Sequence, residues 1–359
     1  NVLLRGYFTP NSGIQYKVEH YLMDLNGEYP LMPEITENFT GTTGLSVITL
    51  DKAYFVTDFR YTEQVAVQAV GFEIVTNSGP IFDEVARLVT EDKIETLGFE
   101  QDFVTFSTFE LLEEIISSEL IPVKGLIEEL REVKDETEIE TIKKACSISD
   151  SAFKFILGEI KPGMSEIEVA NLLDFHMRGL GATGVSFETI VASGVRSAMP
   201  HGVASHKKIE TGEFVTIDFG CYYEGYVSDM TRTIAVGEPS EKLKEIYAIT
   251  LEAQLKVIDA AKPGMSGIQL DAVARDHIAS YGYGAAFGHS TGHGIGLEIH
   301  EGPNVSKLAA KRFVPGNVIT NEPGIYLPGF GGVRIEDDLV ITESGNEVIT
   351  HSPKELIIL

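Results

Sequence analysis

The chain has 359 residues, 43% of them hydrophobic, which is enough for two domains with sizeable cores. Its formal net charge of −26 argues against nucleic acid or an anionic membrane as a partner, because phosphate contacts need clustered Lys and Arg. No apolar run approaches the ~20 residues of a membrane span, and only two cysteines occur, so we expect a cytoplasmic protein without disulfides.

The first third of the chain shows an α/β alternation after residues 1–37, where no element can be assigned. Strands are predicted at 45–50, 53–58, 73–76 and 96–100, and helices at 61–70, 81–90 and 106–118. This pattern predicts a small α/β domain over residues 1–125. A charged stretch beginning at Leu126 marks the boundary, and it leads into a long helix that reaches about Leu157 in a second domain, 126–359.

An internal repeat lies within the second domain. Lys161-Pro-Gly-Met-Ser165 recurs unchanged as Lys262-Pro-Gly-Met-Ser266. In each copy a capping box should start a helix, with Ser165 and Glu168 in the first copy and Ser266 and Gln269 in the second. The repeat predicts a duplicated αβ unit with a site between its halves, and with outer helices drawn from 154–177 and 241–281.

Two carboxylates interrupt neighbouring apolar runs that are typical of strands. Asp218 lies in Phe214-Val-Thr-Ile-Asp-Phe-Gly220, and Asp229 lies in the next run, beyond the predicted turn 222–225. A hairpin centred on that turn would place Asp218 directly opposite Asp229, with their Cβ atoms roughly 5 Å apart. Carboxylates that close repel one another unless cations lie between them.

A second hairpin is predicted around Pro328-Gly-Phe-Gly-Gly332, and it places Glu322 opposite Glu336. Arg334 should lie on the same face, two residues before Glu336. Its position favours an ion pair with the carboxylates over an ordinary exposed side chain. Asp337 and Asp338, which follow, are interpreted as solvated acids and are given no role.

The segment 288–300 offers the neutral ligand that four acids need, and His293 is the histidine that we assign to it. Its glycines argue against a helix. Mostly oxygen ligands with one imidazole suit Mn²⁺ better than a structural zinc, which prefers thiolates. We expect two divalent ions, Mn²⁺ first with Co²⁺, Fe²⁺ or Zn²⁺ as alternatives, on the following ligands: Asp218, Asp229, His293, Glu322 and Glu336.

Taken in order, these motifs resemble those of the M24 metallopeptidases, in particular the aminopeptidase P and prolidase branch. The matching segments are Thr216-Ile-Asp-Phe-Gly, Ser228-Asp-Met-Thr-Arg-Thr, Gly292-His-Gly-Ile-Gly-Leu, Asn321-Glu-Pro-Gly-Ile-Tyr and Val333-Arg-Ile-Glu-Asp. The resemblance runs from about Leu130 to the end. It implies a pita-bread catalytic domain behind a smaller N-terminal α/β domain, with Asp229 and Glu336 bridging two metals.

The resemblance also implies roles on the substrate side. His201, in Met199-Pro-His-Gly, matches the residue that contacts the scissile peptide or moves a proton, and His300 matches the one that stabilises the oxyanion. Glu322 is expected to take the proton of the attacking water, while His289 matches a third pocket histidine. Arg334 is a further candidate for substrate binding.

The function implied is hydrolysis, by water activated at a two-metal centre, of the bond between an N-terminal residue and proline. Aminopeptidase P is the preferred interpretation and Xaa-Pro dipeptidase the alternative. A dipeptidase needs a cation for the substrate's carboxylate, and Asn304 stands where some prolidases carry an arginine. The non-enzymatic alternative is a silent pita-bread protein that binds peptides. The expected partner is a peptide with proline second, and we expect a homodimer.

Overall fold

The computed structural model describes residues 2–5, 16–18, 35–37, 39, 41–49 and 52–359. Within it the chain forms two compact units, residues 1–127 and 128–359. The sequence-based division into domains 1–125 and 126–359 stays a prediction. No helix of the described ranges is long and apolar enough to cross a membrane, and Cys146 and Cys221 are free, buried thiols.

The first unit is built on a mixed six-stranded sheet in the order β7-β5-β4-β1-β8-β9. Its strands are β1 Val2–Arg5, β4 Leu45–Ile48, β5 Ala53–Asp58, β7 Glu73–Asn77, β8 Thr96–Glu100 and β9 Glu119–Val123. A smaller sheet joins β2 Tyr16–Val18, β3 Ile35–Glu37 and β6 Ala69–Val70. The helices are η1 Phe59–Tyr61, α1 Thr62–Gln68, α2 Ile81–Glu91 and α3 Phe106–Ile115.

Most elements predicted for this unit are confirmed, including the antiparallel β4–β5 hairpin; residue 50, in the first predicted strand, lies outside the described residues. Two helices end earlier than predicted. Helix α1 stops at Gln68 because Ala69 and Val70 pair with β3, and α3 stops at Ile115. Strand β9, absent from the prediction, follows α3 and runs parallel to β8. At the end of α1, pairing to a sheet outweighs local helix propensity.

The helices of the second unit match the predicted end of the long helix and divide the two broader predicted spans. They are α4 Leu126–Arg131 at the junction of the units, then α5 Glu136–Leu157, α6 Glu166–Gly179, α7 Glu241–Ala260 and α8 Gly267–Ser280, with short turns η2 Gly194–Ala198 and η3 Gly284–Ala286. Helix α5 ends at Leu157, as predicted. The broader helical spans 154–177 and 241–281 are each interrupted before α6 and α8 by the repeated Lys-Pro-Gly-Met-Ser turn.

The repeat in the sequence is also a repeat in structure. Both capping boxes form, on Ser165 in front of α6 and on Ser266 in front of α8. In both copies the motif's glycine has a positive φ, 89° at Gly163 and 85° at Gly264. Each of these glycines donates its N–H to a following segment at 2.8 Å. Identical residues therefore make matching turns before α6 and α8, and both predicted capping boxes are confirmed.

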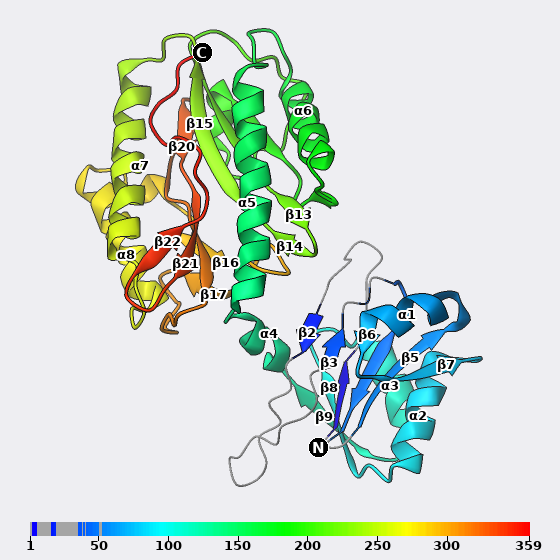
Figure 1. Cartoon of the computed structure of the whole chain (residues 1–359). Helices are drawn as coiled ribbons and strands as arrows, with labels where there is room; N and C mark the ends of the chain where they lie inside the picture. The colour runs from blue at the N-terminus through cyan, green and yellow to red at the C-terminus, as the bar shows by residue number, and fades with distance from the viewer. Residues whose placement is uncertain (1, 6–15, 19–34, 38, 40, 50–51) are drawn as a thin grey trace. The chain divides into compact units, whose positions relative to one another are not determined.

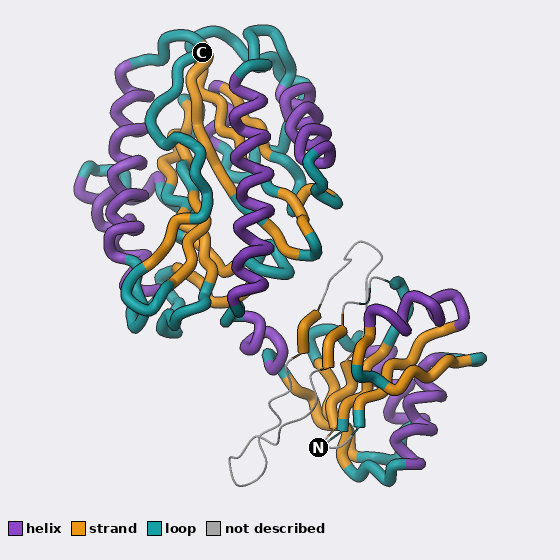
Figure 2. The backbone as a smooth tube through the Cα atoms, viewed as in Figure 1, coloured by secondary structure: helices purple, strands orange, loops and turns teal. Residues whose placement is uncertain are grey.

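The strands of the second unit lie between its helix pairs. They are β10 Gly184–Val185, β11 Ile190–Ser193, β12 Glu213–Phe219, β13 Cys221–Tyr223, β14 Tyr226–Val227, β15 Met230–Val236, β16 Gly292–Gly294, β17 Glu301–Val305, β18 Val318–Asn321, β19 Gly324–Leu327, β20 Gly331–Arg334, β21 Asp337–Ile341 and β22 Asn346–Val348. The sheets run β10-β13-β14, β11-β12-β15, β17-β16-β18-β21-β22 and β19-β20. Figure 1 and Figure 2 show these strands flanked by α5 with α6 and by α7 with α8.

Two apolar cores stabilise the two halves of this unit. One joins α5 and α6 to β11, β12 and β15, with Phe153, Leu173 and Phe219 fully or almost fully buried. The other joins α7 and α8 to the later strands, around Phe287 and Phe313. The candidate ligands come from both halves, so the site depends on the packing of each.

Candidate metal centre and substrate pocket

The first two acids lie on one hairpin, but in a register different from the predicted one. Asp218 of β12 pairs with Thr231 of β15, not with Asp229. The turn is Glu224-Gly225, both with positive φ (47° and 86°), one residue later than the centre we assumed. The correction shifts the partner by two residues, and a shift of two preserves the face. Asp218 and Asp229 therefore both line the same cavity.

Asp229 stands just outside regular pairing, between β14 and β15. A Cβ on Gly220, the residue across the hairpin, would lie 1.8 Å from the Ser228 carbonyl oxygen, so only glycine permits this close approach. The Asp229 N–H donates to the Asp338 carboxylate at 3.0 Å instead of to a neighbouring strand. The expectation that each ligand lies within a strand is therefore wrong for Asp229, and it is also wrong for Glu322 and Glu336, which follow β18 and β20 without belonging to them.

The second hairpin has the predicted register. Gly324 pairs with Arg334 and Asn321 pairs with Asp337, so Glu322 and Glu336 stand opposite each other between the two ladders. Both glutamates lie where the chain passes between the five-stranded sheet and the β19-β20 pair. Their N–H groups donate to Thr291 and Thr231 carbonyls, at 2.8 and 3.0 Å. The interruption of the ladders frees these carboxylates for the cavity.

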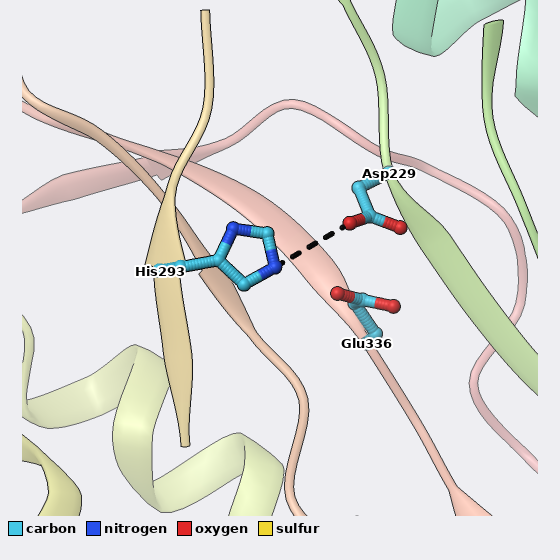
Figure 3. A group of neighbouring side chains, drawn as sticks. All are labelled: Asp229, His293 and Glu336. Atoms are coloured by element: carbon cyan, nitrogen blue, oxygen red, sulfur yellow. Dashed lines mark ion pairs between the residues drawn. The ribbon is translucent and has the colours of Figure 1, made fainter. Parts of the chain in front are cut away.

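His293 lies in β16, as a strand residue and not on a helix, in agreement with the sequence interpretation. Its Nδ1 donates to the Gly294 carbonyl oxygen at 3.0 Å, which leaves Nε2 as the atom with a free lone pair. That Nε2 lies 3.5 Å from a Glu322 oxygen and 3.6 Å from an Asp229 oxygen. Figure 3 shows Asp229, His293 and Glu336 facing one another, and ligand atoms of these three lie within 4.8 Å.

The protonation behaviour of this cluster reflects buried like charges. Burial, together with Glu336 and Asp218, raises the pKa of Asp229 well above its usual value. Burial and Glu322 do the same for Glu336, and burial raises the pKa of Glu322 to about 8 although Arg334 opposes the shift. Burial lowers the pKa of His293 to about 4, so the imidazole is neutral at pH 7. Several buried acids cannot all be ionised without a compensating positive charge, so this cluster favours the binding of cations.

The donor set fits divalent metal ions. One oxygen of Asp218 and one of Asp229 are buried without a hydrogen-bond partner in the described structure. Such oxygens are costly unless a cation meets them. Four carboxylates and one neutral imidazole match the preference of Mn²⁺ and similar ions for oxygen ligands.

The acids open into a cavity of about 450 Å³ that contains every residue named as a candidate from the sequence. It is lined by Phe187, Glu188, Ile190, Pro200, His201, Val203, Asp218, Asp229, His289, Ser290, His293, Ile299, His300, Asn304, Glu322, Arg334 and Glu336. His201 and His300 are exposed to solvent there. The His300 ring lies 4.4 Å, centroid to centroid, from that of His293.

Arg334 lines this cavity but is already engaged on several sides. It forms an ion pair with Asp218 at 2.6 Å and donates to the Tyr326 hydroxyl at 2.8 Å and to the Pro200 carbonyl oxygen at 3.1 Å. The Tyr326 hydroxyl also lies 2.8 Å from Nε2 of His289. The contacts match the predicted ion pair with the carboxylates.

The interpretation of Asp337 and Asp338 as solvated acids is wrong, since both are completely buried. Asp337 pairs with Arg232 at 2.7 Å. Asp338 accepts from the Asp229 N–H at 3.0 Å and from the Cys146 thiol at 3.3 Å. The signal available in the sequence was their position inside the apolar run from Val333 to Ile341.

Comparison with known proteins gives both units a family. Residues 140–343 match metallopeptidase family M24, and residues 36–133 match the creatinase/prolidase N-terminal domain. The solved Xaa-Pro dipeptidase from Bacillus anthracis is 60% identical with a TM-score of 0.89, over 90% of this chain and 91% of that one. The X-Pro aminopeptidase from Thermotoga maritima is 43% identical with a TM-score of 0.85, over 90% and 92%.

Among sequence relatives, an Xaa-Pro dipeptidase from Pyrococcus horikoshii is 49% identical over 264 residues, which cover 74% of this chain and 75% of the relative. These similarities confirm the expected fold, a pita-bread domain that follows an N-terminal creatinase-type α/β domain. The family also implies divalent metal ions at a site of this kind. The chain therefore belongs to metallopeptidase family M24 and is a peptide hydrolase.

Proposed function

We propose that this metallopeptidase is an Xaa-Pro dipeptidase. The observation that carries the proposal is the cluster of four acids and His293, which lines one cavity together with His201 and His300. The relatives named Xaa-Pro dipeptidase, at 60% and 49% identity, support the dipeptide class of substrate. This revises our preference for aminopeptidase P to the alternative.

The proposed cofactor is a pair of divalent ions, Mn²⁺ first. Asp229 and Glu336 would contact both ions, Asp218 would complete one site, and His293 with Glu322 the other. When bound, the ions would lower the pKa of a water molecule and polarise the substrate carbonyl. The unpartnered oxygens of Asp218 and Asp229 support this assignment.

The remaining polar residues have roles that follow from their positions at the cavity. His201 and His300 are exposed there and would donate hydrogen bonds to the oxygen that gains charge. Burial lowers the pKa of His300, and His201 adds to the effect, so its imidazole is neutral near pH 7 and donates through one N–H. Glu322 lines the same cavity and, once ionised, would accept a proton and return it to the leaving nitrogen.

Arg334 and His289 line the substrate pocket, where they would chiefly orient neighbouring side chains. Arg334 fixes the orientation of Asp218 and His289 receives the Tyr326 hydroxyl that Arg334 also contacts. Loss of a partner that orients a metal ligand typically costs about 10–100-fold in metal affinity or activity.

One observation favours aminopeptidase P as a second candidate. Among the described residues that line the cavity, Arg334 is the single arginine or lysine, and it is paired with Asp218. Asn304, exposed at the same cavity, carries no charge for a substrate carboxylate. An aminopeptidase that leaves this side open would need none. The cation for a dipeptide would then come from outside these lining residues, for example from the second subunit of the homodimer that we also propose.

The test is hydrolysis by chelator-treated protein before and after addition of Mn²⁺, Co²⁺ or Zn²⁺, on matched Xaa-Pro dipeptides and Xaa-Pro-Xaa tripeptides. We expect activity to be lost, to return best with Mn²⁺ or Co²⁺, and to favour the dipeptide. Preference for the tripeptide would support aminopeptidase P instead. Peptide binding without hydrolysis in the metal-loaded protein would contradict both. Light scattering of the same sample tests the homodimer.

A further inference from the structure

Glu166 is a buried carboxylate that the proposed mechanism does not use. It is the first residue of α6, and its side chain is completely buried. One oxygen accepts from the N–H and the hydroxyl of Ser193, at 2.7 and 2.9 Å. The other accepts from the N–H and the hydroxyl of Ser205, at 3.1 and 2.6 Å, and from the Arg196 guanidinium. A carboxylate with so many donors is fully satisfied.

These partners lie at the two ends of the segment that carries His201. Ser193 ends β11, and Ser205 follows four residues after His201. Between them, Arg196 reaches from Glu166 to the Val203 carbonyl oxygen, to which it donates at 2.9 Å. The segment is therefore closed into a loop by one carboxylate. His201 stands near its tip, exposed in the cavity.

The same loop is tied to the ligand set from the other side. Arg334 donates to the carbonyl oxygen of Pro200, the residue before His201, while it pairs with Asp218. His201 is thus held between α6, through Glu166, and a candidate metal ligand, through Arg334. A reacting group needs this kind of fixed geometry, since small displacements lower the rate strongly.

The internal repeat shows that Glu166 is not required to start the helix. The equivalent position in the second copy is Gly267, where a Cβ would lie 2.1 Å from the Asn304 carbonyl oxygen. Helix α8 nevertheless begins with the same capping box as α6. The carboxylate at position 166 therefore serves the His201 loop and not the helix start.

We propose that Glu166 is a positioning residue, which holds the loop 193–205 so that His201 faces the metal centre. The proposal rests on the proposed role of His201 in the hydrolysis of Xaa-Pro substrates. It assigns to Glu166 no contact with substrate or metal. Its effect on the rate should pass through His201 alone.

The test compares Glu166→Gln with Glu168→Gln in the metal-loaded full chain. In Glu166→Gln an amide NH₂ group replaces one carboxylate oxygen. That group cannot accept hydrogen bonds, so it meets the N–H and hydroxyl donors around position 166 without pairing with them. Glu168 is exposed, and Gln269 already fills the matching capping position in the second copy. Ser205→Ala, which removes one hydroxyl donor, serves as a milder variant in case Glu166→Gln does not fold.

Two readouts are measured on each variant: hydrogen exchange of the amides in 193–205, and kcat and KM with a metal assay. Glu166→Gln should speed exchange in that loop and lower kcat by about 10-fold or more at unchanged metal content. Ser205→Ala should shift both in the same direction, and Glu168→Gln neither. In a His201→Ala background, Glu166→Gln should cause no further loss.

Unchanged exchange in the loop for both Glu166→Gln and Ser205→Ala would overturn the proposal whatever the activity. Additive losses in the double variant would also overturn it, because Glu166 would then act apart from His201. A third outcome combines faster loop exchange in Glu166→Gln with a normal kcat in His201→Ala. It would refute the proposed role of His201 and the kinetic part of the inference, but it would establish that Glu166 holds the loop.

Discussion

The buried carboxylate of Asp338 explains how Asp229 can lie outside the hydrogen-bonded strand pairs. The Asp229 N–H donates to no neighbouring strand, and an unpaired buried N–H costs about 1–3 kcal/mol. Asp338 removes that cost by accepting the Asp229 N–H, and the Cys146 thiol supports Asp338 in turn. The ligand is thus oriented through its own backbone as well as its side chain.

We predict that Asp229→Ala loses metal and activity together. The substitution removes a carboxylate with an oxygen within 4.8 Å of ligand atoms of both His293 and Glu336. Metal analysis should give fewer ions per chain, and kcat on an Xaa-Pro dipeptide should fall by at least about 100-fold. Glu343→Ala, which removes an exposed acid, is the control. Two ions per chain with near-normal turnover in Asp229→Ala would contradict the assignment.

We predict a different outcome for His201→Ala and for His300→Ala. Both side chains are exposed at the cavity, so their loss should leave the fold and both metals intact. Removal of an oxyanion donor or proton-transfer group should lower kcat by roughly 10²-fold or more. Steady-state kinetics and metal analysis on the same preparations test this. Loss of metal from either variant would make that histidine a ligand, and normal kcat in both would refute their roles.

At the scale of elements, β21 joins the metal centre to a buried ion pair. Its first residue, Asp337, follows Glu336 directly and meets Arg232 of β15, and both side chains are at most 1% exposed. Gln254 and Lys354 also bind the Asp337 carboxylate. The strand that presents Glu336 is therefore anchored at the very next residue.

We predict that Asp337→Ala lowers the free energy of unfolding by about 3–5 kcal/mol, because Arg232 would keep its buried charge without its carboxylate partner. Urea denaturation measures the change. The exposed Asp276 provides a control, and Asp276→Ala should stay within about 0.5 kcal/mol of the wild type.

Burial raises the pKa of Asp337, but Arg232 and Lys354 outweigh it and hold the pKa low. The contribution is therefore present at neutral pH and should vanish as acid protonates the group; an effect independent of pH would contradict this.

The two hairpins show what could be predicted from the sequence and what could not. Around Gly329 the register followed from the glycine-rich turn, and Glu322 and Glu336 stand as expected. Around Glu224 the turn was misplaced by one residue, because a non-glycine residue adopts positive φ there. The prediction that Asp218 and Asp229 share a face was still correct, because strand side chains alternate with period two and the partner shifted by two residues. The apolar run around Asp338 indicates its burial, but its partner Cys146 lies 192 residues away in the sequence, and no local pattern reveals that contact.

At the scale of the whole molecule, the metal centre links folding to pH. Burial raises the pKa of Glu322 to about 8 in the metal-free fold, above its ordinary value of 4.5. A group whose pKa is raised by folding contributes stability below its unfolded pKa and loses it as pH rises through the folded value. The metal-free protein should therefore become less stable from about pH 4.5 to about pH 8.

We predict that Tm of chelator-treated protein falls over this range, and that saturating Mn²⁺ raises Tm more at pH 8 than at pH 5, since metal binding displaces the protons. Differential scanning calorimetry with and without Mn²⁺ measures both effects. Glu322→Gln should flatten the pH dependence of the metal-free protein. An equal gain from Mn²⁺ at both pH values would show that these acids are already ionised without metal.

The division of the ligands between two halves of a duplicated unit has a consequence for the newly made chain. Asp218 and Asp229 come from the first half, whereas His293, Glu322 and Glu336 come from the second. A ribosome must therefore complete the second half before any ion can be held in its final place. Metal loading should come after translation of both halves, so a bound ion would mark chains in which synthesis and assembly are finished.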